Sequence, residues 1–221
     1  MKQLVIFGAS TLAKLAHFYA TGDLNRTVSC FVVDDQYWTG ADFLSLPVLA
    51  WSDFSVQQRP ENVSMFVAIG YRIMRARANA YNTVKAAGYE LVNIVAKSGY
   101  VASDVVMGDN NFIMPGAVLE PGVALASNNV VWSNATICHD SMLGSHNFVA
   151  ANATVGGDVS IGNGNFLGFS SVIMQGRKIG DDTLIGAQSL VRGDTQNLCR
   201  YYGSPAVFAG AVDPELGIMV N

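Results

Sequence analysis

The chain has 221 residues, of which 50% are hydrophobic and only 14% charged, with a formal net charge of -4. This composition suits a protein with a substantial core and excludes a disordered chain. The absence of a basic run argues against nucleic acid as a partner. The first apolar run, Leu4–Phe7, is too short for a signal peptide or a membrane span. The three cysteines form no CxxC pair, so we expect a cytoplasmic, reduced protein without membrane contact or a disulfide framework.

Residues 1–98 alternate apolar runs with helical patterns. The predicted strands are residues 4–8, 28–33, 63–70 and 90–95. The predicted helices run from the N-cap Ser10 to about Gly22, onward from the N-cap Ser52, and from Tyr71 to about Ala87, where Gly88 stops the helix. Strand–helix–strand alternation of this kind predicts a small parallel sheet with crossover helices, an α/β Rossmann-like domain.

Three of these predicted strands end in residues suited to a nucleotide. The stretch "FGAS" places a tight turn at a helix N-terminus, where backbone N–H groups favour a phosphate, although the GxGxxG pattern is absent. Asp34 and Asp35 end the second strand, where related folds meet a ribose or a base. The stretch "AIGYR" ends the third strand. We expect the arginines that follow to form a solvated helix face rather than a diphosphate site: Arg72, Arg75 and Arg77.

From Val101 the sequence repeats every six residues. The first position is aliphatic or Met in sixteen successive hexads, ending at Val191. The fifth position is mostly small, as in Ala117, Ala135, Ser141, Ala153, Ser171 and Thr183. Such a repeat predicts a parallel β-helix, in which each hexad supplies one short strand and one corner and three hexads close a coil. First-position side chains then point inward and stack on their equivalents eighteen residues away.

The repeat ends near Asp194. We expect the stretch "YYGSPAVFAG", residues 201–210, to leave the coil stack as a loop. We also expect the last ten or so residues to form a mobile tail.

A small Rossmann-like domain followed by a left-handed β-helix resembles the bacterial sugar O- and N-acyltransferases. This family includes sialic acid O-acetyltransferases and nucleotide-linked amino-sugar N-acetyltransferases such as the bacillosamine-pathway enzyme. The motifs that carry the resemblance are "NATICHDSMLG", "VGGDVSIGNGNFLG" and "GSPA". The resemblance implies a sugar-nucleotide-binding domain over residues 1–98, a left-handed β-helix acyltransferase domain over 99–203 and a C-terminal loop and tail over 204–221.

The resemblance also implies roles for individual residues. His139 matches the general base of the family, Asp140 matches the acid that follows it, and the Gly157 amide matches the proposed oxyanion donor. Acetyl-CoA binding is expected at Gly157, Gly186, Ala187, Gly203 and Pro205. Binding of the sugar nucleotide is expected at Gly8, Ser10, Asp34, Asp35, Gly70 and His146. Family members are homotrimers with the active site between neighbouring β-helices, and their chemistry needs no metal.

The chemistry suits these residue types, and each has a structural alternative. A neutral imidazole near pH 7 can take the proton of an attacking amine, whereas His139 can also be a solvent-facing corner residue. Asp140 can orient the ring or form a turn. Gly157 is an oxyanion donor or an ordinary corner glycine. Direct attack requires no nucleophile, so we expect no covalent role for Cys138.

Two positions depart from the family pattern. Phe148 stands where many members have a second histidine, and His146 lies two residues earlier, where contact with substrate and a surface role are equally open. "GASTLA" replaces a Gly-x-Gly-Gly-His-Gly loop. We expect Trp132 and Phe148 to pack in the trimer and His17 to pack within its helix.

The expected function is acetyl-CoA-dependent N-acetylation of a nucleotide-linked amino sugar, and a sialic-acid-type sugar O-acetyltransferase is the alternative. A β-helix zinc hydratase would require three histidine ligands, whereas the β-helix half of the chain holds only two histidines, His139 and His146. A non-enzymatic scaffold or nucleotide sensor is the third interpretation.

Overall fold

The computed structural model describes residues 2–220. The chain divides into two compact units. The first contains the residues up to Gly70 together with Ala76–Ile94, and the second contains Tyr71–Arg75 and the residues from Val95 onward. None of the helices in the described part of the chain is both long and apolar enough to span a bilayer.

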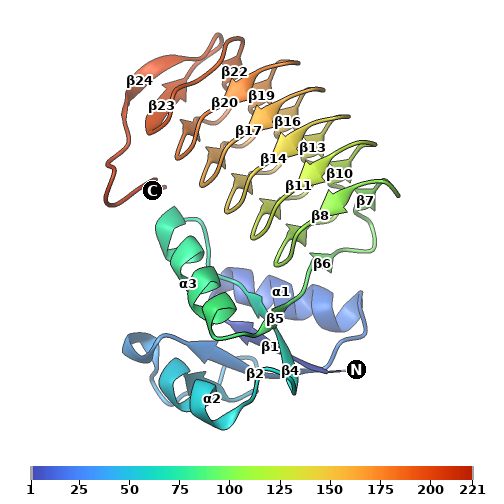
Figure 1. Cartoon of the computed structure of the whole chain (residues 1–221), viewed down its shortest axis with the longest axis vertical. Coiled ribbons are helices and arrows are strands. Elements are labelled where there is room, and N and C mark those ends of the chain that lie inside the picture. Colours follow the sequence, from blue (N-terminus) through green and yellow to red (C-terminus); the bar gives the residue numbers. More distant parts are fainter. Residues whose placement is uncertain (1, 221) are drawn as a thin grey trace. The chain divides into compact units, whose positions relative to one another are not determined.

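The first unit is built on a five-stranded sheet whose paired strands all run parallel, in the order β3-β2-β1-β4-β5 (Figure 1). The strands are β1 (Gln3–Phe7), β2 (Val28–Val33), β3 (Val48–Ala50), β4 (Val63–Val67) and β5 (Glu90–Leu91). The helices are α1 (Thr11–Gly22), α2 (Trp51–Gln57) and α3 (Met74–Ala86), with a 3-10 turn η1 (Asp35–Tyr37). This strand order reverses between β1 and β4, which is the switch point where open parallel sheets bind ligands.

The sheet is buried because its strands are apolar on both faces. Val5 and Phe7 of β1 share one core cluster with Phe54 of α2 and Val84 of α3. On β2, the ring of Phe31 lies 5.9 Å from that of His17 of α1, so His17 packs within the unit. The predicted Rossmann-like domain is therefore confirmed.

Several predicted boundaries in this unit were wrong. The run at residues 90–95 is not one strand but two, β5 and β6 (Ile94–Val95), which belong to different sheets because the chain passes there from one unit to the next. The predicted third strand ends at Val67 rather than Gly70, and α3 begins at Met74 rather than Tyr71. Strand β3 was not predicted, since only three residues form it.

The predicted helix caps were only partly right. Ser10 is the N-cap residue of α1, but its side chain makes no capping hydrogen bond. Helix α2 begins earlier than expected, with Ala50 as its N-cap. Asp35 Oδ1 instead accepts a hydrogen bond from the Ser52 N–H at 2.9 Å. A side chain from another element thus satisfies a free N–H of the first turn.

The second unit is a left-handed parallel β-helix made of two-residue strands, stacked as successive coils (Figure 1). Its strands are β7 (Tyr100–Val101), β8 (Val106–Met107), β9 (Phe112–Ile113), β10 (Val118–Leu119), β11 (Ala124–Leu125), β12 (Val130–Val131), β13 (Thr136–Ile137), β14 (Met142–Leu143), β15 (Phe148–Val149), β16 (Thr154–Val155), β17 (Ser160–Ile161), β18 (Phe166–Leu167), β19 (Val172–Ile173), β20 (Lys178–Ile179), β21 (Leu184–Ile185) and β22 (Leu190–Val191). Every third strand pairs in parallel, so that Ile137 pairs with both Leu119 and Val155. This eighteen-residue register confirms the predicted coil.

The interior of the β-helix is filled by the predicted first-position residues. From Ile113 to Val191 they are all buried, and Val101 and Met107 are partly buried against the same cluster. A buried ladder of side-chain amides runs beside them, since the oxygen of Asn111, Asn129, Asn147 and Asn165 each accepts the backbone N–H of the residue eighteen positions later. The ladder satisfies these buried side-chain oxygens and backbone N–H groups, whereas within residues 2–220 the buried Nδ2 of Asn165 has no hydrogen-bond partner.

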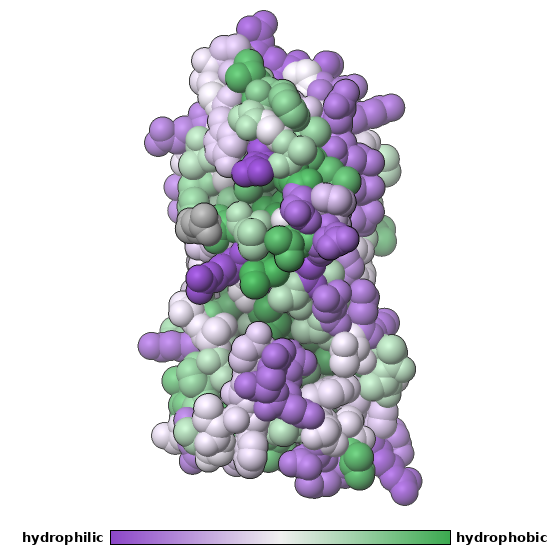
Figure 2. All heavy atoms as spheres, turned by 90° about the vertical axis from the view of Figure 1, so that its left-hand side faces the viewer, coloured by the Kyte–Doolittle hydropathy of each residue, from purple (hydrophilic) through white to green (hydrophobic). Residues whose placement is uncertain are grey.

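The predicted loop and mobile tail after the repeat were wrong. Residues 199–211 form a hairpin of β23 (Cys199–Tyr202) and β24 (Val207–Ala211), and β23 continues the stack by pairing with β21. Figure 2 views the side on which β24 lies in Figure 1, where hydrophobic residues are interspersed with hydrophilic ones. The final residues are docked, because the Met74 N–H donates to the Ile218 carbonyl at 3.1 Å and Ile218 is 1% exposed.

The expectation of a solvated arginine face was right for Arg72, which is exposed, and wrong for Arg75 and Arg77. Arg75 pairs with Asp182 at 3.2 Å and donates to the Pro214 carbonyl at 2.9 Å. Arg77 is 1% exposed, and burial lowers its pKa to about 10. Likewise Phe148 does not stand on an open wall for trimer packing, since its ring is buried 4.6 Å from Tyr71 and 5.4 Å from Trp132.

Candidate active site

His139 lies in the corner between β13 and β14, two residues after the inward-pointing Ile137. Asp140 follows with a positive φ of 58°, and Asp158 repeats that conformation one coil later with a φ of 56°. Aspartate tolerates this left-handed region better than most residues. The eighteen-residue register therefore stacks the two aspartates in one column, with His139 directly before the first.

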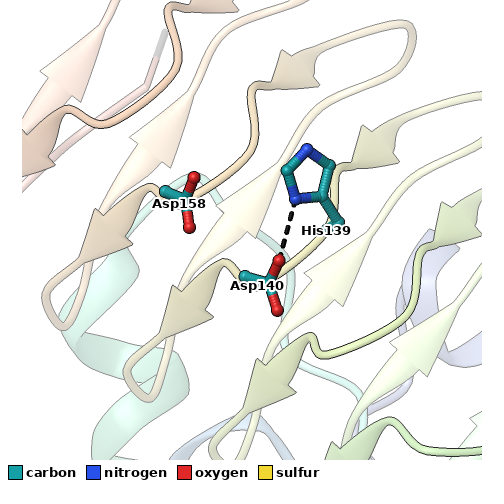
Figure 3. A group of neighbouring side chains, drawn as sticks. All are labelled: His139, Asp140 and Asp158. Carbon is teal, nitrogen blue, oxygen red and sulfur yellow. Dashed lines mark hydrogen bonds and ion pairs between the residues drawn. The ribbon is translucent and has the colours of Figure 1, made fainter.

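The imidazole of His139 and the carboxylate of Asp140 form a pair. Nδ1 of His139 lies 2.9 Å from Oδ2 of Asp140, and the two side chains are 50% and 63% exposed. Figure 3 shows the ring directed away from the strand, with Asp158 on the adjacent coil. Because Nδ1 faces the carboxylate, Nε2 is the nitrogen left to receive a proton.

Gly157 lies against the histidine ring. A Cβ placed on Gly157 would come within 2.5 Å of both Cε1 and Nε2 of His139, so only glycine leaves room for the ring. The Gly157 carbonyl accepts the Gly176 N–H at 2.9 Å. Within residues 2–220, the Gly157 N–H has no hydrogen-bond acceptor. A fixed backbone donor beside the imidazole is what an oxyanion would require.

The protonation of this corner follows from its carboxylates. The hydrogen bond to Asp140 raises the pKa of His139, and the charges of Asp140, Asp158 and Glu120 act in the same direction. For Cys138, burial raises the pKa of the thiol, and Glu120 adds to the effect. A raised thiol pKa disfavours the thiolate, which is the nucleophilic form.

The donors available to a metal at this corner do not fit the hydratase alternative. Among the described residues, the one group able to hold an ion is His139 with Asp140 and Asp158, whose ligand atoms all lie within 4.8 Å of one another. A catalytic zinc site of that class uses three histidines, whereas His146 lies at another corner, between β14 and β15. There its Nδ1 lies 2.8 Å from Nδ2 of Asn128.

The residues expected to bind acetyl-CoA form a second group at the end of the coil stack. Gly186 is buried beneath the ring of Tyr202, which an added Cβ would overlap, and Ala187 beside it is exposed. Gly203 has a φ of 103°, and its N–H donates to Ser189 Oγ at 3.0 Å. Pro205 follows a cis peptide bond in the hairpin loop and is exposed. Gly157 belongs to the His139 corner instead.

In the first unit, the residues expected to bind the nucleotide gather at one edge of the sheet. Gly8 follows β1 with a φ of 123°, and a Cβ there would lie 2.8 Å from the Ala68 carbonyl oxygen, so the turn requires glycine. Asp34 follows β2, and burial together with the charge of Asp35 raises its pKa. Gly70 lies three residues after β4 and Ser10 is exposed at the start of α1.

Sequence reasoning missed two contributors to the His139 corner, Asp158 and Glu120. Asp158 lies eighteen residues after Asp140 and faces the same imidazole. Glu120 lies nineteen residues before His139, and its Oε2 accepts the His139 backbone N–H at 2.9 Å. Writing the sequence with three hexads, one coil, on each row would have placed Asp158 and Glu120 next to the His139–Asp140 pair.

The fold and this corner define a class of protein, a hexapeptide-repeat β-helix joined to a parallel-sheet domain. A family model described as "Bacterial transferase hexapeptide (six repeats)" matches residues 104–139. None of the curated proteins compared with the chain matches it.

Particular solved structures share the whole fold. The acetyltransferase domain of PglB from Neisseria gonorrhoeae, in complex with acetyl coenzyme A, is 22% identical with a TM-score of 0.85, covering 94% of this chain and 99% of that one. PerB from Caulobacter crescentus, in complex with CoA and GDP-perosamine, is 24% identical with a TM-score of 0.76, covering 95% and 98%. WeeI from Acinetobacter baumannii is 16% identical with a TM-score of 0.65, covering 95% and 100%.

Proposed function

We propose that this protein is an acetyl-CoA-dependent N-acetyltransferase that acts on the amino group of a nucleotide-linked sugar. The observation that carries the proposal is the His139–Asp140 pair, which lies over Gly157 and its unpaired N–H on a hexapeptide β-helix. The similar structures support the substrate class, since one is named an acetyltransferase domain bound to acetyl coenzyme A and another is bound to CoA and GDP-perosamine.

The reaction proceeds by direct attack in this proposal. The sugar amine adds to the thioester carbon, and Nε2 of His139 takes the proton that the amine loses. Asp140 accepts the Nδ1 hydrogen bond and stabilises the imidazolium. The Gly157 N–H donates to the oxyanion of the tetrahedral intermediate. The C–S bond then breaks, and the imidazolium returns its proton to the CoA thiolate.

This route requires neither a metal nor a covalent acyl-enzyme. The raised pKa of Cys138 disfavours its thiolate, so the cysteine beside His139 is a poor nucleophile. All bonds between heavy atoms that change lie in the two substrates, and the protein supplies proton transfer, charge stabilisation and position.

The remaining residues serve binding in this proposal. Gly8, Ser10, Asp34, Asp35 and Gly70 hold the nucleotide at the carboxyl edge of the parallel sheet. Asp35 already holds the start of α2 through the Ser52 N–H, which leaves Asp34 as the freer carboxylate. Acetyl-CoA contacts Gly157, Gly186, Ala187, Gly203 and Pro205. The enzyme works as a homotrimer in the cytoplasm.

The test is release of CoA thiol from acetyl-CoA, with nucleotide-linked 3-amino and 4-amino sugars and matched hydroxyl sugars as acceptors. Turnover on an amine that falls about 10²-fold or more in His139→Ala is expected for loss of a general base. The side chain is half exposed, so the variant should keep the wild-type melting temperature. Turnover on hydroxyl sugars alone would establish O-acetylation, and full activity of His139→Ala would refute the base.

A further inference from the structure

Glu120 lies on the coil that precedes His139 and contacts the histidine from there. Its Oε2 accepts the backbone N–H of His139 at 2.9 Å, across nineteen residues of sequence. The same carboxylate also adds to the raised pKa of the Cys138 thiol, which burial raises most. The Glu120 side chain is partly buried, next to Pro121, whose carbonyl accepts the Asp140 N–H at 3.1 Å. Two consecutive residues, His139 and Asp140, are therefore anchored through their backbone N–H groups to the Glu120–Pro121 turn.

The equivalent position on the next coil lacks this anchor. The N–H of Gly157, eighteen residues after His139, has no acceptor among the described residues. The same corner thus treats two equivalent amides in opposite ways. The backbone N–H of His139, the proposed base, is held by the carboxylate of Glu120. The backbone N–H of Gly157, proposed to bind the oxyanion, has no acceptor within residues 2–220. A hydrogen bond to a carboxylate is stronger than a neutral one, so Glu120 restrains the His139 backbone firmly.

We propose that Glu120 is a positioning residue for His139, which fixes its backbone from the coil below and supplies negative charge beneath its imidazole. This inference rests on the proposed function, because it assigns Glu120 to the reaction through the general base. Glu120 itself touches no reacting atom in this role.

Three carboxylates act on the imidazole from the elements around it. Asp140 follows it on the same turn, Asp158 lies on the coil above, and Glu120 lies on the coil below. The Cys138 thiol precedes the histidine on its own coil. The carboxylate of Glu120 favours the protonated ring, as do those of Asp140 and Asp158, so each raises the pKa of His139. Loss of the Glu120 charge therefore lowers that pKa, and the base form persists to lower pH.

The experiment compares Glu120→Gln with Glu120→Ala in the full chain. Glutamine keeps an oxygen for the His139 N–H and removes the charge, whereas alanine removes both. The pH dependence of kcat/KM is measured together with the NMR titration of the three histidines, in which His139→Ala identifies the His139 signal. Asp104→Asn is the matched control, because Asp104 Oδ2 accepts the Gly122 N–H at 3.0 Å on the same column of corners.

Both Glu120 variants should lower the pKa of His139 in the NMR titration and move the acid limb of kcat/KM to lower pH. Alanine should also lower the plateau of kcat roughly 10- to 100-fold, because a small displacement of a catalytic group costs up to that much, and glutamine should lower it less. Asp104→Asn should change neither. An unchanged His139 pKa together with an unchanged plateau in both variants, while His139→Ala is inactive, would overturn the proposal. Full activity of His139→Ala would instead overturn the proposed function.

Discussion

Two corners of the same β-helix carry the two histidines of the repeat, and they differ in how their polar groups are used. At the His146 corner, Nδ1 of His146 lies 2.8 Å from Nδ2 of Asn128, whose Oδ1 accepts from Asn110. Backbone N–H groups at that corner donate to side chains of the next coil, as the Ser145 N–H does to Oδ1 of Asn163. At the His139 corner, charged groups surround an exposed ring and the Gly157 N–H is open. The two corners share a positive φ, 58° at Asp140 and 66° at His146, but they place different groups around their histidines.

Filling the space beside the ring should break the His139 corner most severely. Gly157→Ala would place a Cβ within 2.5 Å of the imidazole and displace it. We expect kcat to fall about 10²-fold or more, the range for loss of a general base or of an oxyanion donor. Gly193→Ala is the matched control, because Gly193 occupies the same position two coils later and its replacement adds a Cβ that no non-adjacent atom of residues 2–220 approaches within 4 Å. An equal loss of kcat in both variants would show that any alanine in this column of corner glycines lowers activity, whether or not it contacts the His139 ring.

Neutralising the partner of the ring should alter the pH profile. The pKa of His139 is raised chiefly by its hydrogen bond to Asp140. The reaction needs the neutral ring, so activity rises with pH through that pKa. Asp140→Asn tolerates the positive φ and removes the charge. We expect the acid limb of kcat/KM to move to lower pH and the plateau to fall tenfold or more, since a mis-oriented ring is a poor base.

An acid limb that stays in place in Asp140→Asn would contradict the pairing. The same titration of His146 provides an internal comparison, because its Nδ1 lies 2.8 Å from Nδ2 of the uncharged Asn128.

The amide ladder should matter for stability and not for chemistry. Oδ1 of Asn147 accepts the Asn165 backbone N–H at 2.8 Å, and Nδ2 of Asn147 donates to the Gly144 and Gly162 carbonyls. Asn147→Ala leaves these buried groups unpaired, and we expect the free energy of unfolding to fall by about 2–4 kcal/mol. The exposed Gln196→Ala should change it by less than about 0.5 kcal/mol. Urea denaturation measures both, and equal midpoints would show that the ladder contributes nothing.

Replacing the second histidine should have the smallest effect. Asparagine stands at the two equivalent positions below His146, Asn110 and Asn128, and it accepts the same positive φ. We therefore expect His146→Asn to change kcat less than about threefold and unfolding by less than about 0.5 kcal/mol. A large rise in KM for the acceptor with unchanged stability would instead establish His146 as a substrate contact.

Much of the fold was predictable because its signals are local and repeated. Inward residues recur at every sixth position from Val101 to Val191, and burial of nearly all of them confirms the register. Errors gathered where no repeat exists. The strands β5 and β6 look like one apolar run, and the hairpin Cys199–Ala211 has a loop-like composition. The docking of Ile218 depends on a partner, Met74, far away in the chain.

By itself the sequence determined the coil, its register and the place of His139 in a corner, because a six-residue period leaves no other way to bury those side chains. It also determined that Gly157 lies one coil above, since eighteen residues close a coil. Only the tertiary structure decided that His139 pairs with Asp140, that Glu120 holds its backbone and that the Gly157 N–H stays open. Those features depend on side-chain direction and on contacts between coils, which a period in the sequence does not encode.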